Sequence, residues 1–139
     1  AEQRIGYQLE LAKRRGGNFP ESNRVVDLVR NKLTEWQPPV SLVHGDLWSG
    51  NAAISSDGAP IILDPATYYG DRETDLAMTE LFGGFPTAFY NGYNEAWELD
   101  SGYRQRKSIY NLYHVLNHFN LFGGGYASQA KTIIQRLLP

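Results

Sequence analysis

Three oxygen-bearing side chains, those of Asp46, Asn51 and Asp64, have the types and spacing that phosphoryl transfer requires. Asp46 and Asn51 belong to the segment HGDLWSGN (residues 44–51), which has the His-x-Asp-x-x-x-x-Asn spacing of a kinase catalytic loop. A carboxylate at Asp46 could orient an attacking hydroxyl group and accept its proton. The amide oxygen of Asn51 and the carboxylate of Asp64 are hard ligands of the kind that Mg²⁺ prefers. The sequence therefore predicts a magnesium-dependent phosphoryl-transfer site.

The spacing alone is weak evidence, because unrelated chains contain it occasionally by chance. Its context is more specific. Residues 40–43 form an apolar run typical of a strand, and residues 52–55 and 60–63 predict a hairpin across the favoured turn Asp57-Gly58. A hairpin pairs the start of one arm with the end of the other, so we expect Asn51 and Asp64 to lie together. The alternative is that these polar residues only cap turns and helices.

Neighbouring residues admit two interpretations each. The aromatic face of Trp48 could stack on a sugar, or its ring could pack under the loop. Asp71 precedes a predicted helix and is expected to cap it, although it could instead contact substrate or metal. His44 occupies a position that usually makes structural hydrogen bonds in kinase-like loops. His114 and His118 are four residues apart, but no third metal ligand is evident, so we interpret them as packing or substrate-contact residues.

The elements that must position these residues are mostly helices. Apolar periodicity and breaker residues predict helices over 2–15, 22–36, 72–82, 86–97, 104–122 and 128–138. Ser22 is expected to be the N-cap of the second helix. Residues 66–71 read as a loop. The order of elements predicts one α+β domain over residues 1–139, mainly helical, with a small strand cluster that carries the polar loop.

Composition limits the classes of partner. The 139 residues include 13 basic and 15 acidic side chains, and this balance argues against a dedicated nucleic-acid surface. The chain has no cysteine, which excludes disulfides and thiolate metal sites. No apolar run approaches the roughly 20 residues of a membrane span, and no signal-peptide core is present. We expect a soluble, cytoplasmic protein without nucleic-acid or membrane partners.

Longer strings carry a family resemblance. The strings HGDLWSGN, ILDPATYYGDRETDLAM, LFGGFP and LYHVLNHFNLFGGGY resemble the fructosamine (ketosamine) kinase family, and the match covers residues 2–138. Aminoglycoside and choline kinases share the Asp, Asn and Asp skeleton. In contrast, Trp48, the Asp64-Pro65-Ala66 segment and the Gly83-Gly84-Phe85-Pro86 segment are typical of the ketosamine branch.

The resemblance implies a fold and an activity. It implies the C-terminal lobe of a protein-kinase-like fold, and ATP-dependent phosphorylation of the 3-hydroxyl group of ketosamines, a repair reaction for glycated amines. By match to the motif, Asp46 would be the catalytic base, and Asn51 and Asp64 would hold Mg²⁺ in the ATP site. Trp48 and Asp71 are candidate substrate contacts from their position, with packing and helix capping as the alternatives. Asp75 resembles the family's acidic residue that braces the catalytic loop.

The sequence departs from the family's pattern before the motif. Only 43 residues precede His44, and none of them resembles the phosphate-covering loop, the ATP-binding Lys or its Glu partner of the N-terminal lobe. We therefore expect little or no activity from this chain alone. The alternatives are another small-molecule kinase, of aminoglycoside or homoserine type, and a non-catalytic binding or dimerising module. We also expect exposed apolar surface near Leu42 and Ile62, which would favour self-association.

Overall fold

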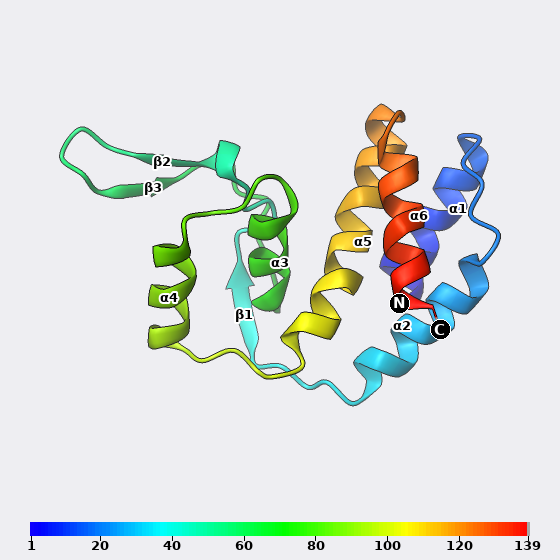
Figure 1. Cartoon of the computed structure of the whole chain (residues 1–139), viewed down its shortest axis with the longest axis horizontal. Coiled ribbons are helices and arrows are strands. Elements are labelled where there is room, and N and C mark those ends of the chain that lie inside the picture. The colour runs from blue at the N-terminus through cyan, green and yellow to red at the C-terminus, as the bar shows by residue number, and fades with distance from the viewer. Residues whose placement is uncertain (139) are drawn as a thin grey trace. The chain divides into compact units, whose positions relative to one another are not determined.

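The computed structural model describes residues 1–138, which are mostly helical with two small antiparallel sheets (Figure 1). They form two compact units. Unit 1 consists of residues 1–37 and the described residues from Ser108 onward, and unit 2 consists of residues 38–107. The long helix α5 (Tyr103–Phe122) contributes residues to both. This architecture confirms the predicted mainly helical α+β class.

Unit 1 is a helical unit with an apolar core. It contains a π-helical turn (Glu2–Gly6) that continues into α1 (Tyr7–Arg14), then α2 (Ser22–Thr34), most of α5, and α6 (Tyr126–Leu137). The predicted apolar stripes face inward, and their buried members include Ile5, Leu9, Val25, Val29, Ile109, Leu112 and Leu116. Burying such side chains contributes roughly 1.5–3 kcal/mol each, which offsets the conformational entropy lost on folding.

A buried polar seam joins α1 to α5 inside unit 1. The Asn120 side-chain amide donates to the main-chain and side-chain oxygens of Gln8, at 2.9 and 2.6 Å. Gln8 in turn donates to Asn117 at 3.3 Å, and Arg15 donates to the main-chain oxygen of Asn120. Because buried polar groups without partners are costly, these bonds fix the relative register of the two helices.

Ser22 does not cap α2, and that prediction was wrong. The cap position is Glu21, whose side chain makes no capping hydrogen bond. The Ser22 hydroxyl instead donates to the main-chain oxygen of Phe19 at 2.5 Å. Serine hydroxyl groups often bond to nearby main-chain groups in this way. Here the Ser22 hydroxyl bonds to the turn before α2 instead of capping the helix.

Unit 2 contains both sheets and two helices. Strand β1 (Val40–Val43) pairs with β4 (Tyr68–Asp71), from Val40 opposite Asp71 to Val43 opposite Tyr68. Strand β2 (Ala52–Ile54) pairs with β3 (Pro60–Ile62) in the predicted hairpin. Helices α3 (Glu73–Leu81) and α4 (Thr87–Ala96) follow. Strand β4 corrects the expected loop over residues 66–71. Its tyrosines, glycine and acid lack the alternation of a strand, and its partner lies about 30 residues earlier.

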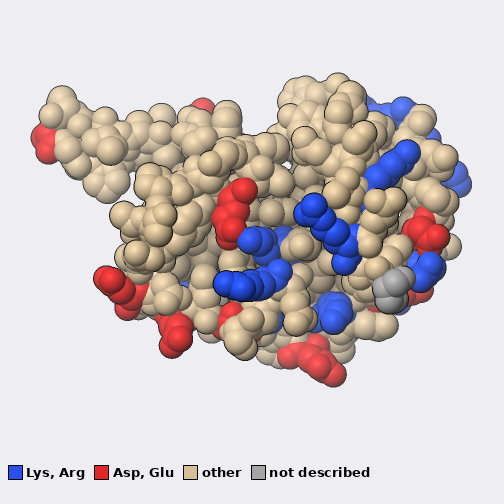
Figure 2. Space-filling model, viewed as in Figure 1, with Lys and Arg blue, Asp and Glu red and all other residues tan. Residues whose placement is uncertain are grey.

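Exposed apolar side chains lie on both sheets of unit 2, as the sequence predicted. Leu42 and Ile62 are 64% and 63% exposed, and Val40, Ile54 and Tyr69 are more exposed still. Figure 2 shows the hairpin as an arm almost without charge apart from an acidic group near its tip, which matches Asp57 as the only charged residue between 52 and 63. None of the described helices is long and apolar enough to cross a membrane.

His114 makes unit 1 sensitive to acid. Its side chain is 5% exposed, its Nε2 atom has no hydrogen-bond partner within the described residues, and burial lowers its pKa from 6.5 to about 4. The unfolded chain therefore binds a proton near pH 6.5, whereas the folded chain resists it until about pH 4. The stabilising contribution of neutral His114 is fully present above pH 6.5 and is lost as the pH falls from 6.5 to about 4.

We predict that His114 accounts for a loss on the order of 2–3 kcal/mol of unfolding free energy between pH 7 and pH 4.5. Denaturant titrations followed by circular dichroism at both pH values measure it. His114→Leu should flatten this acid slope relative to the unmodified chain, whereas His118→Gln on the same helix should keep it. Equal slopes in the unmodified chain and His114→Leu would contradict the prediction.

Candidate active site

The Asp75 carboxylate holds the loop that follows β1. Asp75 lies in the first turn of α3, and its Oδ2 and Oδ1 atoms accept hydrogen bonds from the main-chain N–H groups of His44 and Gly45, at 2.6 and 2.9 Å. These two N–H groups lie just beyond the β1–β4 ladder, which ends at Val43, so they have no partner in the sheet. One charged side chain thus satisfies both donors with short, charge-assisted bonds. The bracing role that the resemblance implied for Asp75 matches this geometry.

Gly45 lets a second segment approach the loop. The Ala66 N–H group donates to the main-chain oxygen of His44 at 2.8 Å. Gly45 has φ +83°, in the left-handed region, and a Cβ atom at this position would overlap the carbonyl oxygen of Ala66. Only glycine combines this conformation with so close a backbone contact.

His44 is a structural hydrogen-bonder, as predicted. Its Nε2 atom donates to the main-chain oxygen of Leu63 at 2.8 Å, and its Nδ1 atom accepts from the Asp46 N–H group at 3.3 Å. These two contacts together favour the neutral imidazole with its proton on Nε2. The ring is 8% exposed and ties the catalytic-loop segment to the end of β3. No proton-transfer role is needed to explain its position.

Asp46 and Asn51 lie together. The Nδ2 atom of Asn51 donates to the main-chain oxygen of Asp46 at 2.9 Å and to its carboxylate Oδ2 at 3.1 Å. Asn51 is 7% exposed, whereas Asp46 is only partly buried. Because the nitrogen of the Asn51 amide faces Asp46, its oxygen is the atom available to a cation. The structure thus bonds Asp46 to Asn51, whereas the contact expected from the sequence was that between Asn51 and Asp64.

Asp64 comes directly after Leu63, whose main chain is hydrogen-bonded to Asn51. The Leu63 N–H group donates to the main-chain oxygen of Asn51 at 2.8 Å, so Asp64 is the residue that follows the Leu63–Asn51 pair. Asp64 is exposed and has φ +48°, the only non-glycine residue with positive φ among those described. Aspartate tolerates this left-handed conformation, and such residues occur often at functional sites.

Trp48 and Asp71, the predicted substrate contacts, both have local partners. The ring of Trp48 packs edge-on against Phe82 at 6.4 Å between centroids and covers Gly50, yet it remains 38% exposed. The Asp71 carboxylate accepts from the Glu73 N–H group at 2.9 Å, but the cap position of α3 is Arg72, not Asp71 as predicted. Their substrate contacts stay predictions.

The described residues contain no cluster of three or more His, Cys, Asp or Glu side chains able to hold a metal ion. His114 and His118 accordingly form no such site. A site built from Asn51 and Asp64 supplies only two protein ligands. Mg²⁺ typically takes one or two carboxylates from the protein and the remaining ligands from substrate phosphates and water. The chemistry of the two oxygen donors fits that pattern.

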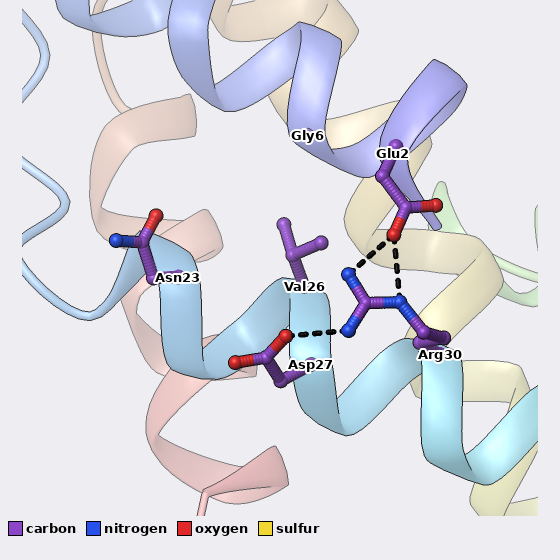
Figure 3. A pocket seen from close by; sticks show the side chains of 6 residues that line it. All are labelled: Glu2, Gly6, Asn23, Val26, Asp27 and Arg30. Carbon is purple, nitrogen blue, oxygen red and sulfur yellow. Dashed lines mark hydrogen bonds and ion pairs between the residues drawn. The ribbon is translucent and has the colours of Figure 1, made fainter.

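Unit 1 has a separate hollow of about 470 Å³, lined by Glu2, Gly6, Asn23, Val26, Asp27 and Arg30 (Figure 3). Arg30 crosses it and binds the carboxylates of Glu2 and Asp27. The charges of these three side chains therefore neutralise one another. Their network is exposed and contributes little to stability. None of the predicted site residues lines it, so we do not assign it a ligand.

Sequence reasoning missed the ion pair between Glu73 and Arg106. The two residues are 33 positions apart, Glu73 is buried and Arg106 is partly buried, and their contact lies at one end of α3. The signal that could have found Glu73 is its position between Asp71 and Asp75, at the start of α3. Nothing in the sequence pairs it with Arg106 in particular.

Comparisons with known proteins agree on one family. The family model for fructosamine kinase matches residues 1–139. "Probable ketoamine kinase" of Synechocystis is 63% identical over 138 residues, which cover 99% of this chain and 47% of that protein. "Protein-ribulosamine 3-kinase, chloroplastic" of Arabidopsis thaliana is 44% identical over 140 residues, covering 99% of this chain and 43% of that protein.

A solved structure supports the same relationship. The crystal structure named "Putative fructosamine-3-kinase" from Haemophilus somnus 129PT matches with a TM-score of 0.91 at 39% identity, and the match covers 99% of this chain and 48% of that one. The chain therefore spans about half the length of the curated relatives it matches.

Gly45 offers a test of the loop's backbone, with Gly58 as a matched control. Both have φ near +85°, but a Cβ atom at Gly58 meets nothing within 4 Å. Gly58→Ala should cost about 1–2 kcal/mol of unfolding free energy for the left-handed conformation alone. Gly45→Ala should cost about 1–3 kcal/mol more, because of the overlap with Ala66. Chemical denaturation measures both, and equal costs would show that the close contact with Ala66 does not exist.

Proposed function

Because this chain belongs to the fructosamine kinase family, we propose that it is the catalytic-loop part of a kinase that transfers phosphate from ATP to the 3-hydroxyl group of ketosamines. The protein-kinase-like C-terminal lobe is the corresponding fold proposal, and the reaction would serve the repair of glycated amines. The observation that supports the activity most directly is the bonding of Asp46 to Asn51 in a loop held by Asp75. The names of the relatives support the substrate class.

Asp46 would act as the base in this proposal. Its Oδ2 atom accepts from Asn51, which orients the carboxylate and leaves its other oxygen to accept a hydrogen bond from the substrate's hydroxyl group. A base in this position takes the proton as the hydroxyl oxygen attacks the terminal phosphate of ATP. The anchoring of the loop by Asp75 supplies the rigidity that such positioning requires.

Asn51 and Asp64 would hold Mg²⁺, which neutralises phosphate charge when bound. Trp48 would offer its exposed ring face to the sugar, whose C–H face is apolar enough to stack on it. Asp71 remains a proposed substrate contact beside its hydrogen bond from the Glu73 N–H group. The cytoplasmic location likewise remains a proposal, supported by the absence of cysteine from the sequence.

The chain alone is expected to have little or no activity. Positioning of reactants accounts for about 7–11 kcal/mol of a barrier, whereas a general base contributes about 10²–10⁴-fold. Retaining the base while lacking groups that cover the ATP phosphates should therefore leave a weak catalyst. A small-molecule kinase of aminoglycoside or homoserine type is the alternative activity.

The kinase activity should be assayed on a joined protein, made of the N-terminal half of the Synechocystis relative followed by this chain. We predict that the joined protein phosphorylates fructosamines or ribulosamines, that the chain alone does not, and that Asp46→Asn lowers kcat about 10²–10⁴-fold. Asp27→Asn, an exposed carboxylate in unit 1, serves as the control and should leave kcat unchanged. Phosphorylation of an aminoglycoside or homoserine but of no ketosamine would overturn the proposed substrate.

Exposed apolar side chains support a second proposal, self-association of the chain. Val40, Leu42 and Tyr69 lie exposed on one small sheet, and Ile54 and Ile62 on the other. Exposed apolar surface of this kind favours contact with a second copy. Sedimentation velocity should show a concentration-dependent dimer or larger species, which Leu42→Lys together with Ile62→Lys should weaken. A monomer at millimolar concentration would contradict this proposal.

A further inference from the structure

Within unit 2, residues at the start of α5 form hydrogen bonds with both ends of α3. Together these contacts form the α3–α5 clamp. Glu73 and Glu80 lie seven residues apart in α3 and therefore share a face of that helix. At one end, Arg106 donates from Nε and Nη2 to the two carboxylate oxygens of Glu73, at 2.8 and 2.7 Å. At the other end, Tyr103 and Lys107 each donate to the carboxylate of Glu80 at 2.6 Å.

The Glu73–Arg106 pair is the buried part of this clamp. The side chains of Glu73 and Arg106 are 3% and 11% exposed, and their fork geometry fixes both distance and orientation. Arg106 also donates to Asp100 at 2.6 Å. The hydrogen bonds to Glu73 raise the pKa of Arg106, so the guanidinium group stays charged at every relevant pH.

Stability alone is a weak reason for such a pair. Buried ion pairs often contribute no more than an apolar replacement of similar volume, because both charges lose their hydration. What the fork provides is a defined orientation of α3 at its first turn. That same turn carries Asp75, two residues after Glu73, and Asp75 holds the main-chain N–H groups of His44 and Gly45.

We propose that Glu73 and Arg106 are positioning residues for the segment that carries Asp46, and that they act through Asp75. The bonds from Asp75 to the loop are 2.6 and 2.9 Å long, and hydrogen bonds weaken steeply when their atoms separate or tilt. A rotation of α3 after loss of the fork therefore loosens the loop while the helix itself persists. The kinetic consequence of this inference rests on the proposed kinase function.

Amide hydrogen exchange of this chain, followed residue by residue by NMR, tests the positioning role without any enzyme assay. Glu73→Gln and Arg106→Lys each remove the charged fork while keeping a similar shape. Either should speed exchange at the His44 and Gly45 amides at least about tenfold and leave core amides of unit 1, such as those of Leu112 and Val25, unchanged. Asp75→Asn gives the positive control, and Glu10→Gln, from the exposed Glu10–Arg14 pair, gives the matched control.

Two outcomes would overturn the proposal. Unchanged exchange at His44 and Gly45 in both variants would show that the loop does not depend on the fork. Faster exchange at every protected amide would show that the pair only contributes to global stability. Arg106→Lys retains the positive charge, so exchange at His44 and Gly45 can be measured in this variant if Glu73→Gln does not fold.

A kinetic measurement separates this inference from the proposed function. In the joined protein used for the kinase assay, both variants should lower kcat about tenfold or more with KM for the ketosamine unchanged, because positioning acts on the reacting step rather than on binding. Local loosening together with an unaltered kcat would overturn the positioning role while the kinase function stands. Local loosening in the variants together with an inactive unmodified joined protein would overturn the kinase function while the positioning role stands.

Discussion

The contact on which the candidate site depends is a single carboxylate that accepts two consecutive main-chain N–H groups. Where β1 ends, the chain turns away from its ladder and leaves the donors of His44 and Gly45 without sheet partners. Asp75 supplies both acceptors from the first turn of α3. An ionised acceptor makes these bonds stronger than neutral ones, and the resulting anchor fixes where Asp46 emerges. Every later feature of the site is built on that anchor.

Around this anchor, main-chain bonds bring the oxygen-bearing residues into one segment of unit 2. His44 reaches the end of β3 through Leu63, and Leu63 bonds back to Asn51 at the start of the hairpin. Asn51 then closes the loop on Asp46. A short hairpin is well suited to this arrangement, because its antiparallel pairing brings the residue before one arm next to the residue after the other. The chemistry proposed for the site also needs the Asp64 side chain to reach Asn51, and that contact stays a prediction.

Local patterns predicted the parts of this arrangement that depend on neighbouring residues. The hairpin and the helices follow from turn residues and periodicity, and the structural role of His44 follows from its position in a kinase-like loop. Strand β4 could not be predicted, because Tyr68–Asp71 becomes a strand only through pairing with the distant β1. The contact of Arg106 with Glu73 and the burial of His114 also depend on tertiary packing. Ser22 has the residue type of an N-cap, but its hydroxyl bonds to the preceding turn instead. The sequence pattern thus located the chemistry, whereas long-range contacts determine how firmly it is held.

The most direct test of this account is the free energy of unfolding of Asp75→Ala compared with that of Asp27→Ala, measured by denaturant titration. Asp75→Ala leaves two N–H groups of the loop without acceptors and should cost about 2–4 kcal/mol. Asp27 makes an exposed ion pair with Arg30, so its removal should cost less than about 0.5 kcal/mol. Equal losses for the two variants would contradict the claim that Asp75 anchors the loop.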